Sequence, residues 1–303
     1  MRSQTEPTLV PGSTGGGGRK APSQTPMPAR LGRYELIHEL GKGAMGVVYR
    51  GRDPRINREV AIKAIPLAEE FEPEDLQQAR ASFFREAETA GRLSHPHIVT
   101  IYDAGEDHGT AYIAMELLHG QHLVDYTSPE RLLPPAIAIE IVARLADALH
   151  YAHQNQVVHR DIKPANIMFD APSGELKITD FGIARLTDSG KTRTGVVFGT
   201  PSFMSPEQLQ GRPVTGRSDL FSLAVSLFQM LTGQLPFRAD TMPGLMIRIA
   251  QEQHPRICSM NPALTPGLDA FFDRALAKEP ADRYPNGASF AQALRDLNSP
   301  VQR

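Results

Sequence analysis

Ionisable and amide side chains gather in two short stretches in the middle of the chain, "HRDIKPAN" at residues 159–166 and "DFG" at residues 180–182. Asp161, Lys163 and Asn166 are close together in a segment that Pro164 keeps from forming a regular helix. Carboxylate and amide oxygens are ligands that Mg²⁺ prefers, and a lysine offers a cation to a phosphate. Each tripeptide alone is a weak signal, but together they predict chemistry on a phosphate–magnesium complex.

A glycine-rich stretch nearer the start, "LGKGAMGVVY" at residues 40–49, is a second candidate for binding phosphates. Gly41, Gly43 and Gly46 have a G-x-G-x-x-G spacing that more than one class of nucleotide-binding protein uses. A dinucleotide site needs a helix directly after the glycines. The β-branched and aromatic residues 47–49 predict a strand instead. The glycines are therefore expected in a β-hairpin, and a plain hairpin tip remains the alternative until partners are found.

Two further residues are candidate partners of this loop. Lys63 in "VAIK" shares a strand face with Ala61, and a lysine beside a small apolar residue suits a pocket for a flat base and phosphates. On its own, a strand lysine is more often a solvated charge. Glu86 follows Phe83 by three positions on the buried stripe of a helix expected at residues 74–93. An inward carboxylate needs a partner, and Lys63 is the obvious one.

The elements that must position these residues change in kind along the chain. Strands are expected at residues 33–43, 46–53, 58–67, 97–102 and 111–116, and the first three favour an antiparallel sheet. Beyond the helix at 74–93, helices are expected at about residues 134–154, 205–210, 218–232, 243–252, 267–277 and 287–297. A β-rich first third and an α-rich remainder predict an α+β protein of two unlike lobes. The cleft between them is expected near residues 116–120.

The composition of the chain limits its expected cellular location and its classes of partner. The chain has 303 residues, 41% of them hydrophobic, and a formal net charge of −2, which gives no overall attraction to nucleic acid or to an anionic membrane. The single cysteine, Cys258, excludes an intramolecular disulfide. No apolar run approaches the ~20 residues of a membrane span, and no signal peptide is recognisable. We expect a cytoplasmic protein with no membrane anchor and no nucleic-acid partner.

Residues 1–31 differ from the rest in being rich in Gly, Pro, Ser and Thr, as in "PGSTGGGG". Such a composition has little to bury, which predicts a disordered, solvated tail. A docking or phospho-regulated segment is the alternative.

Seven motifs occur in a characteristic order: "GKGAMGVVY", "VAIK", "HRDIKPANIMF", "TDFGIAR", "GTPSFMSPEQ", "SDLFSLAV" and "ADRYPNG". In these motifs the chain resembles the eukaryotic-like (Hanks-type) protein kinases, and most of all the bacterial serine/threonine kinases, from about residue 33 to residue 297. The resemblance implies a bilobal fold, with an antiparallel β-rich N-lobe holding one key helix and a mainly α-helical C-lobe. It also implies an enzyme that transfers the γ-phosphoryl group of ATP to Ser or Thr hydroxyls of protein substrates.

The same resemblance divides the chain. It implies a kinase domain at residues 32–298, with the N-lobe at 32–116, the hinge at 116–120 and the C-lobe at 121–298. Residues 299–303 would form a short C-terminal tail.

The resemblance also assigns residues to the nucleotide. The loop over the phosphates would be Gly41, Lys42, Gly43, Ala44, Met45 and Gly46. The adenine would lie between Val48, Ala61 and Met168, with Met115 as gatekeeper and Glu116 and Leu117 supplying hinge hydrogen bonds from their backbone.

Transfer itself is assigned to a few charged residues. Lys63, held by Glu86, would bind the α- and β-phosphates. Asp161 would accept the proton of the substrate hydroxyl, and Lys163 would neutralise the γ-phosphate. Asn166 and Asp180 would hold Mg²⁺, for which Mn²⁺ is an alternative.

Regulation and support are implied as well. Thr192 and Thr194 would be autophosphorylated, because a phosphothreonine adds about −1.5 to −2 charge and suits Arg160. A homodimer acting in trans is a partner consistent with this; plain loop threonines are the alternative. Thr200 would contact Asp161 and Lys163. Glu207 and Arg283 would form a structural ion pair, and Asp219 would anchor the backbone of the catalytic loop.

Two rival functions are weaker. A pseudokinase that only binds partners would lack one of the key Lys, Asp or Asn residues, and none is missing here. A nicotinamide oxidoreductase built on the glycine motif is disfavoured by the strand expected after Gly46.

Overall fold

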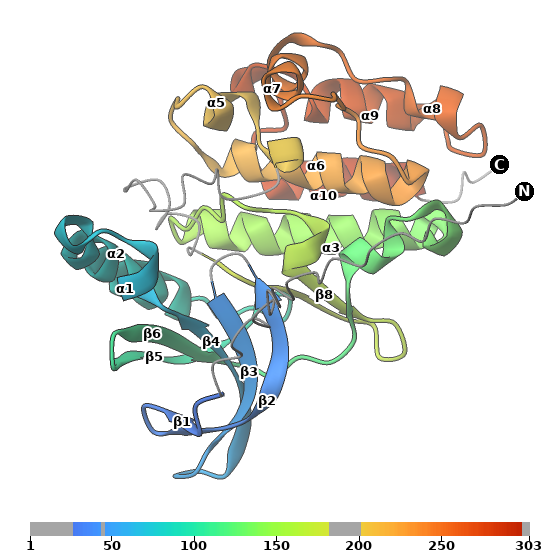
Figure 1. Ribbon diagram of the computed structural model, residues 1–303. Coiled ribbons are helices and arrows are strands. Elements are labelled where there is room, and N and C mark those ends of the chain that lie inside the picture. Colours follow the sequence, from blue (N-terminus) through green and yellow to red (C-terminus); the bar gives the residue numbers. More distant parts are fainter. Residues whose placement is uncertain (1–26, 44–45, 182–200, 299–303) are drawn as a thin grey trace, which may run out of the picture.

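The computed structural model describes residues 27–43, 46–181 and 201–298, and shows a strand-rich lobe beside a helical lobe (Figure 1). This confirms the predicted α+β class and the two unlike lobes. The predictions for Ala44, Met45, Thr192, Thr194 and Thr200 lie outside the described residues.

The small lobe is built on one antiparallel sheet with the strand order β1-β2-β3-β4-β6-β5. Its strands are β1 (Arg30–Leu31), β2 (Tyr34–Gly43), β3 (Gly46–Asp53), β4 (Arg58–Ile65), β5 (Ile101–Asp107) and β6 (Thr110–Met115). β2 and β3 flank the glycines as a hairpin, which confirms the strand expected after Gly46. The buried Leu31 pairs with Tyr34, so the sheet begins two residues before the predicted domain start at residue 32.

The edge strand β5 differs from its expected position, residues 97–102. It begins at Ile101 and runs through the polar residues 103–107, which pair with β6. Pairing with an apolar neighbour strand overrides the poor strand propensity of Asp and Gly in this segment.

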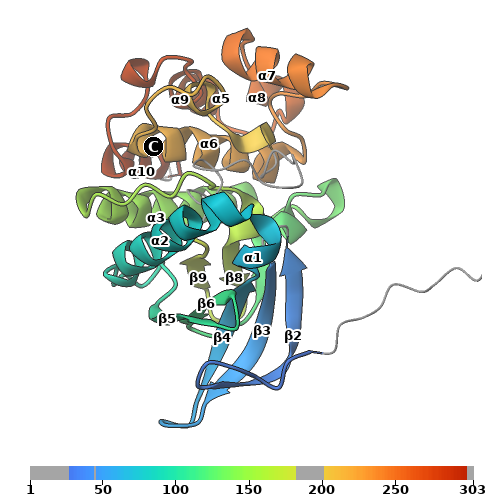
Figure 2. The same ribbon diagram turned by 60° about the vertical axis from the view of Figure 1, so that its left-hand side comes forward.

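Two helices cover one face of this sheet: α1 (Leu67–Glu70), which was not predicted, and α2 (Pro73–Gly91), which was. In Figure 2 they lie between the sheet and the helical lobe. Phe83 and Ala87 of α2 are buried against Ala61 and Ile113 of β4 and β6. The apolar stripe of α2 therefore packs on the sheet, and Glu86 beside it is half-buried.

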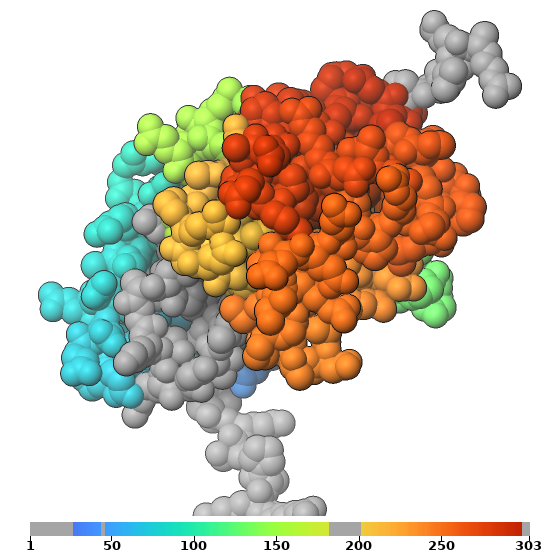
Figure 3. All heavy atoms as spheres, turned by 90° about the horizontal axis from the view of Figure 1, so that it is seen from above, coloured from blue at the N-terminus to red at the C-terminus, as the bar shows by residue number. Residues whose placement is uncertain are grey.

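The large lobe is a helical assembly around α6. Its helices are α3 (Pro135–Gln154), α5 (Pro206–Leu209), α6 (Gly216–Thr232), α7 (Met242–Gln251), α8 (Ile257–Met260), α9 (Gly267–Ala275) and α10 (Gly287–Asn298). Short 3₁₀ turns lie at Leu123–Tyr126, Pro129–Arg131, Pro164–Asn166, Pro201–Phe203 and Pro280–Asp282. Almost every residue of α6 is buried, as expected of an apolar helix enclosed by other helices. Figure 3, a view onto the large lobe, shows that the later part of the chain, in orange and red, forms most of this face.

A second sheet has three strands: β7 (Gln121–His122), β8 (Ile167–Asp170) and β9 (Glu175–Ile178). β9 also reaches the small lobe, because Ile178 forms a bridge with Ile98 and its backbone bonds to His97 and Val99. The chain that follows the catalytic loop is thereby fixed to the small lobe as well.

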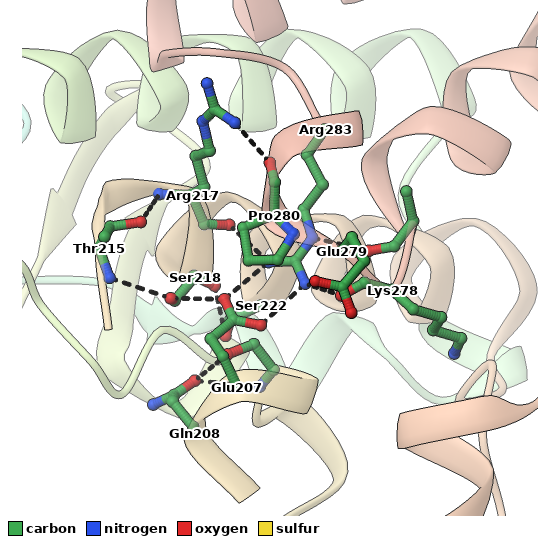
Figure 4. Close-up of polar contacts among 12 residues, drawn as sticks. Glu207, Gln208, Thr215, Arg217, Ser218, Ser222, Lys278, Glu279, Pro280 and Arg283 are labelled. Carbon is green, nitrogen blue, oxygen red and sulfur yellow. Dashed lines mark hydrogen bonds and ion pairs between the residues drawn. The ribbon is translucent and has the colours of Figure 1, made fainter. Parts of the chain in front are cut away.

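A buried ion pair joins α5 to the segment before α10 in the large lobe (Figure 4). The guanidinium of Arg283 donates to both carboxylate oxygens of Glu207 at 2.8 Å, and each residue is 2% exposed. Ser218 of α6 donates its hydroxyl to Glu207 at 2.6 Å, and Arg283 also donates to the carbonyls of Ala277 and Lys278. This confirms the expected structural pair and shows that its charges are fully hydrogen-bonded, as burial requires.

We predict that Arg283→Met lowers the free energy of unfolding by about 3–5 kcal/mol, because it leaves the Glu207 carboxylate buried without its cation. Chemical denaturation measures it. The control is Arg212→Ala, which breaks the exposed pair of Arg212 with Glu279 (3.2 Å) and should cost less than about 1 kcal/mol. Equal losses would contradict this.

The pair also sets a pH dependence. Burial raises the pKa of Glu207, but Arg283 and Ser218 outweigh burial, and the pKa lies below its ordinary value of 4.5. The stabilisation is therefore present above pH 4.5 and lost as the pH falls through the lowered pKa.

Candidate active site

The catalytic loop is anchored by one buried carboxylate. Asp219, near the start of α6 and 1% exposed, accepts backbone N–H bonds from His159 at 2.9 Å and Arg160 at 2.8 Å. Its third partner is His153 of α3, at 2.8 Å. Burial raises the pKa of Asp219, but the hydrogen bond and charge of His153 lead the interactions that lower it below its ordinary value. The predicted anchor is thus present, and Asp219 is held ionised.

The loop brings three of the predicted residues into one hydrogen-bonded group. The Lys163 ammonium lies 2.7 Å from the Asp161 carboxylate. The Asn166 amide nitrogen donates to the carbonyl of Asp161 at 2.8 Å and to the same carboxylate at 2.9 Å. The second Asp161 carboxylate oxygen, Oδ1, has neither of these partners and can face a substrate.

Asp180 brings the small lobe into this group. It follows β9, has a positive φ of 63°, and its carboxylate lies 2.8 Å from the ammonium of Lys63 on β4. Burial raises the pKa of Asp180, but the charge and hydrogen bond of Lys63 outweigh it, so the pKa lies below its ordinary value. Phe181 packs edge-on against His159, with ring centroids 4.6 Å apart. The charged residues of the two lobes are therefore in direct contact.

The expected partner of Lys63 is not the one that the structure gives it. Within the described residues, Lys63 forms its ion pair with Asp180 and not with Glu86, which is half-buried on α2. The spacing of the α2 stripe predicts that Glu86 is not fully exposed, and the structure has it half-buried. It cannot show how close α2 comes to β4, because that depends on the packing of the helix on the sheet.

The residues assigned to the adenine share one face of the small-lobe sheet. Val48 is paired with Lys63 across β3 and β4, and Ala61 with Met115 across β4 and β6. Cross-strand partners point to the same side of a sheet. These residues belong to one apolar cluster with Leu117 of the hinge. Met168, on β8 of the large lobe, is half-buried.

The segment predicted as the hinge contains a polar contact that was not predicted. The Glu116 carboxylate accepts from the ammonium of Lys177 of β9 at 2.9 Å and from the N–H of Thr100 at 3.2 Å. The signal available in the sequence was a lysine within "ELKIT", because a lysine in a buried strand requires a partner. The contact between His153 and Asp219 was likewise not predicted.

Gly46 is the glycine of the loop that cannot be replaced. Its φ is 144°, and a Cβ placed on it would lie 1.9 Å from the carbonyl oxygen of Ala64. A Cβ on Gly41 would meet nothing within 4 Å. The hairpin can therefore pass close to β4 only if Gly46 has no side chain.

The donor set at the junction fits a magnesium ion that also binds phosphate oxygens. Because the Asn166 amide nitrogen is used by Asp161, its amide oxygen is the atom left to bind a cation. Asp180 adds a carboxylate. No group of three or more His, Cys, Asp or Glu in the described part of the chain could hold a metal alone. Mg²⁺ that is shared with a nucleotide needs only one or two protein carboxylates.

Among the described residues, no helix is both long enough and apolar enough to cross a bilayer.

A β-sheet lobe and a helical lobe with a lysine, two aspartates and an asparagine at their junction define the architecture of the protein kinases. The protein kinase domain family model matches residues 34–296. The chain therefore belongs to this family, in its bacterial serine/threonine branch.

Individual relatives agree with this placement. Serine/threonine-protein kinase PrkC of Bacillus subtilis is 38% identical over 254 residues, which cover 84% of this chain and 38% of PrkC. Serine/threonine-protein kinase PknF of Mycobacterium tuberculosis is 39% identical over 269 residues, 86% of this chain and 55% of PknF. The chain thus spans only part of these relatives. The crystal structure of the M. tuberculosis PknI kinase domain matches with a TM-score of 0.73 and 31% identity, over 90% of this chain and 100% of that domain.

We predict that Gly46→Ala destabilises the nucleotide-free protein by about 1–3 kcal/mol, because it adds a clash and an unfavourable φ. Gly41→Ala, on the same hairpin, should change stability by less than about 0.5 kcal/mol. Thermal unfolding of both variants measures this, and similar melting temperatures would refute the assigned role of Gly46.

Proposed function

We propose that this chain is an ATP-dependent kinase that phosphorylates Ser and Thr hydroxyls of protein substrates. The observation that supports it most is the contact between the lobes, where Lys63 meets Asp180 beside the Asp161–Lys163–Asn166 group. Phosphoryl transfer needs little covalent chemistry from the protein. It needs the reactants to be aligned and their negative charge to be neutralised, and these side chains are suited to both.

The chemical step uses the catalytic loop. The substrate hydroxyl oxygen bonds to the γ-phosphorus, the bond from that phosphorus to the β–γ bridging oxygen breaks, and ADP leaves. Asp161 accepts the hydroxyl proton, with its carboxylate oriented by Asn166 and Lys163. Lys163 neutralises charge on the transferred group.

The nucleotide lies under the glycine loop. Lys63 binds the α- and β-phosphates, and Val48, Ala61, Met115 and Met168 enclose the adenine. The backbones of Glu116 and Leu117 bond to its edge. Mg²⁺ on Asp180 and Asn166 would offset phosphate charge and help to align the transferred group. In this state we expect Lys63 to exchange its contact with Asp180 for one with Glu86.

We predict that Lys63→Met abolishes phosphorylation of a generic basic protein, with a loss of at least about 10³-fold, because the phosphates lose their main cation. A radiolabelled-ATP assay measures the loss, and thermal unfolding checks that the variant is folded. Retained activity in a folded Lys63→Met protein would refute the assignment.

We further propose that the enzyme is activated by autophosphorylation at Thr192 and Thr194, acting in trans between two copies. The added negative charge suits the guanidinium of Arg160, which directly precedes the catalytic Asp161.

Mass spectrometry of the active enzyme should find phosphate on both threonines, and the Thr192→Ala/Thr194→Ala protein should lose most of its activity. To test the trans step, active enzyme is mixed with the Lys63→Met protein, whose threonines should then become phosphorylated. Bare threonines in a fully active enzyme would contradict the proposal.

A further inference from the structure

Gln208, the residue after Glu207 on α5, makes contacts that the roles assigned so far do not use. Figure 4 shows both side chains leaving this short helix, that of Glu207 toward Arg283. The amide oxygen of Gln208 accepts from both the N–H (3.0 Å) and the hydroxyl (2.9 Å) of Ser205. Its amide nitrogen donates to the carbonyl oxygen of Arg160 at 2.8 Å, 48 positions earlier in the chain.

That carbonyl belongs to the peptide group that joins Arg160 to Asp161. The N–H of the same peptide, which is that of Asp161, donates to the Nδ1 atom of His159 at 3.2 Å. The preceding N–H, that of Arg160, donates to Asp219 at 2.8 Å. The peptide group just before the catalytic aspartate is thus hydrogen-bonded at both its N–H and its carbonyl. Gln208 donates the bond to the carbonyl.

The backbone here needs such support. Arg160 has a φ of 70°, a left-handed conformation that a residue with a long side chain adopts only when its surroundings impose it. A rotation of the following peptide would turn the Asp161 carboxylate away from Lys163 and Asn166. The hydrogen bond from Gln208 opposes that rotation.

We propose that Gln208 is a positioning residue for Asp161, which transmits the placement of α5 to the catalytic loop through the Arg160 carbonyl. This rests on the proposed kinase function. α5 follows the segment that begins at Asp180. One amide side chain therefore couples the position of α5 to the orientation of the catalytic aspartate.

A glutamine suits this position because it is a donor and an acceptor at once. The backbone N–H of Ser205 holds the amide oxygen, and the NH₂ group is thereby turned toward Arg160. Glutamate keeps the acceptor for Ser205 but replaces the donor with an oxygen that repels the carbonyl. Methionine has a similar length and offers no donor. Ser205→Ala removes the hydroxyl, which also caps the start of α5, but it keeps the Ser205 N–H that donates to the Gln208 amide oxygen and leaves the Arg160 carbonyl bond in place.

The test compares Gln208→Glu, Gln208→Met and Ser205→Ala in steady-state phosphorylation of a generic basic protein. We expect kcat to fall about 10- to 100-fold in both Gln208 variants, with the KM for ATP within about twofold of wild type. Ser205→Ala should keep kcat within about twofold. Thermal unfolding establishes that all three proteins are folded.

A pH series separates positioning from simple structural damage. As the pH is lowered from about 8 to about 5.5, a glutamate facing a carbonyl becomes protonated and can donate again. The kcat of Gln208→Glu should therefore approach that of wild type at low pH, whereas that of Gln208→Met should not. Parallel pH profiles, kcat unchanged in the Gln208 variants, or an equal loss in Ser205→Ala would each overturn the proposal.

Amide hydrogen exchange provides a readout that is independent of activity. Peptides containing Arg160 and Asp161 should exchange faster in both Gln208 variants than in wild type or Ser205→Ala, and equal exchange would overturn the proposed contact. If the wild-type protein transfers no phosphate, the kinase function fails while the exchange data still test the role of Gln208.

Discussion

Asp219 holds three parts of the large lobe together, and the rest of the site depends on that buried carboxylate. It is nearly inaccessible to solvent, so each of its oxygens must be hydrogen-bonded. His153 brings in α3, and the N–H groups of His159 and Arg160 bring in the catalytic loop. The unusual backbone of Arg160 persists because these bonds hold it. The direction of the Asp161 carboxylate follows from that conformation.

Two neighbouring residues of α5 extend this anchoring in opposite directions. Glu207 binds Arg283 and Ser218, which fixes α5 to α6 and to the segment before α10. Gln208 reaches the Arg160 carbonyl. A helix of only four residues cannot hold its position by its own hydrogen bonds. Its place is therefore set by side chains, and α5 in turn supports the loop.

The two lobes are joined by contacts of different chemistry. Ile98 and Ile178 pair through their backbones, Glu116 of the hinge binds Lys177 of β9, and Lys63 binds Asp180. The first two contacts join β9 to the small lobe and to Glu116. The third is an ion pair between side chains that are only partly exposed. At such a position the attraction between opposite charges is stronger than in bulk water. Lys63 and Asp180 can exchange this contact for contacts with a nucleotide without a change of fold.

The sequence by itself determined the motifs, the division into a strand-rich and a helical lobe, and the spans of the long helices. These properties are local, since they follow from periodicity and from residue types at fixed spacing. It also indicated Asp219 and the Glu207–Arg283 pair, though only through the resemblance to a family. Tertiary structure decided which charges meet. Lys63 contacts Asp180 rather than Glu86, Lys177 contacts Glu116, and Gln208 contacts a carbonyl 48 positions away. Such pairings depend on distances of a few ångströms between packed elements, and no pattern along the chain specifies those distances.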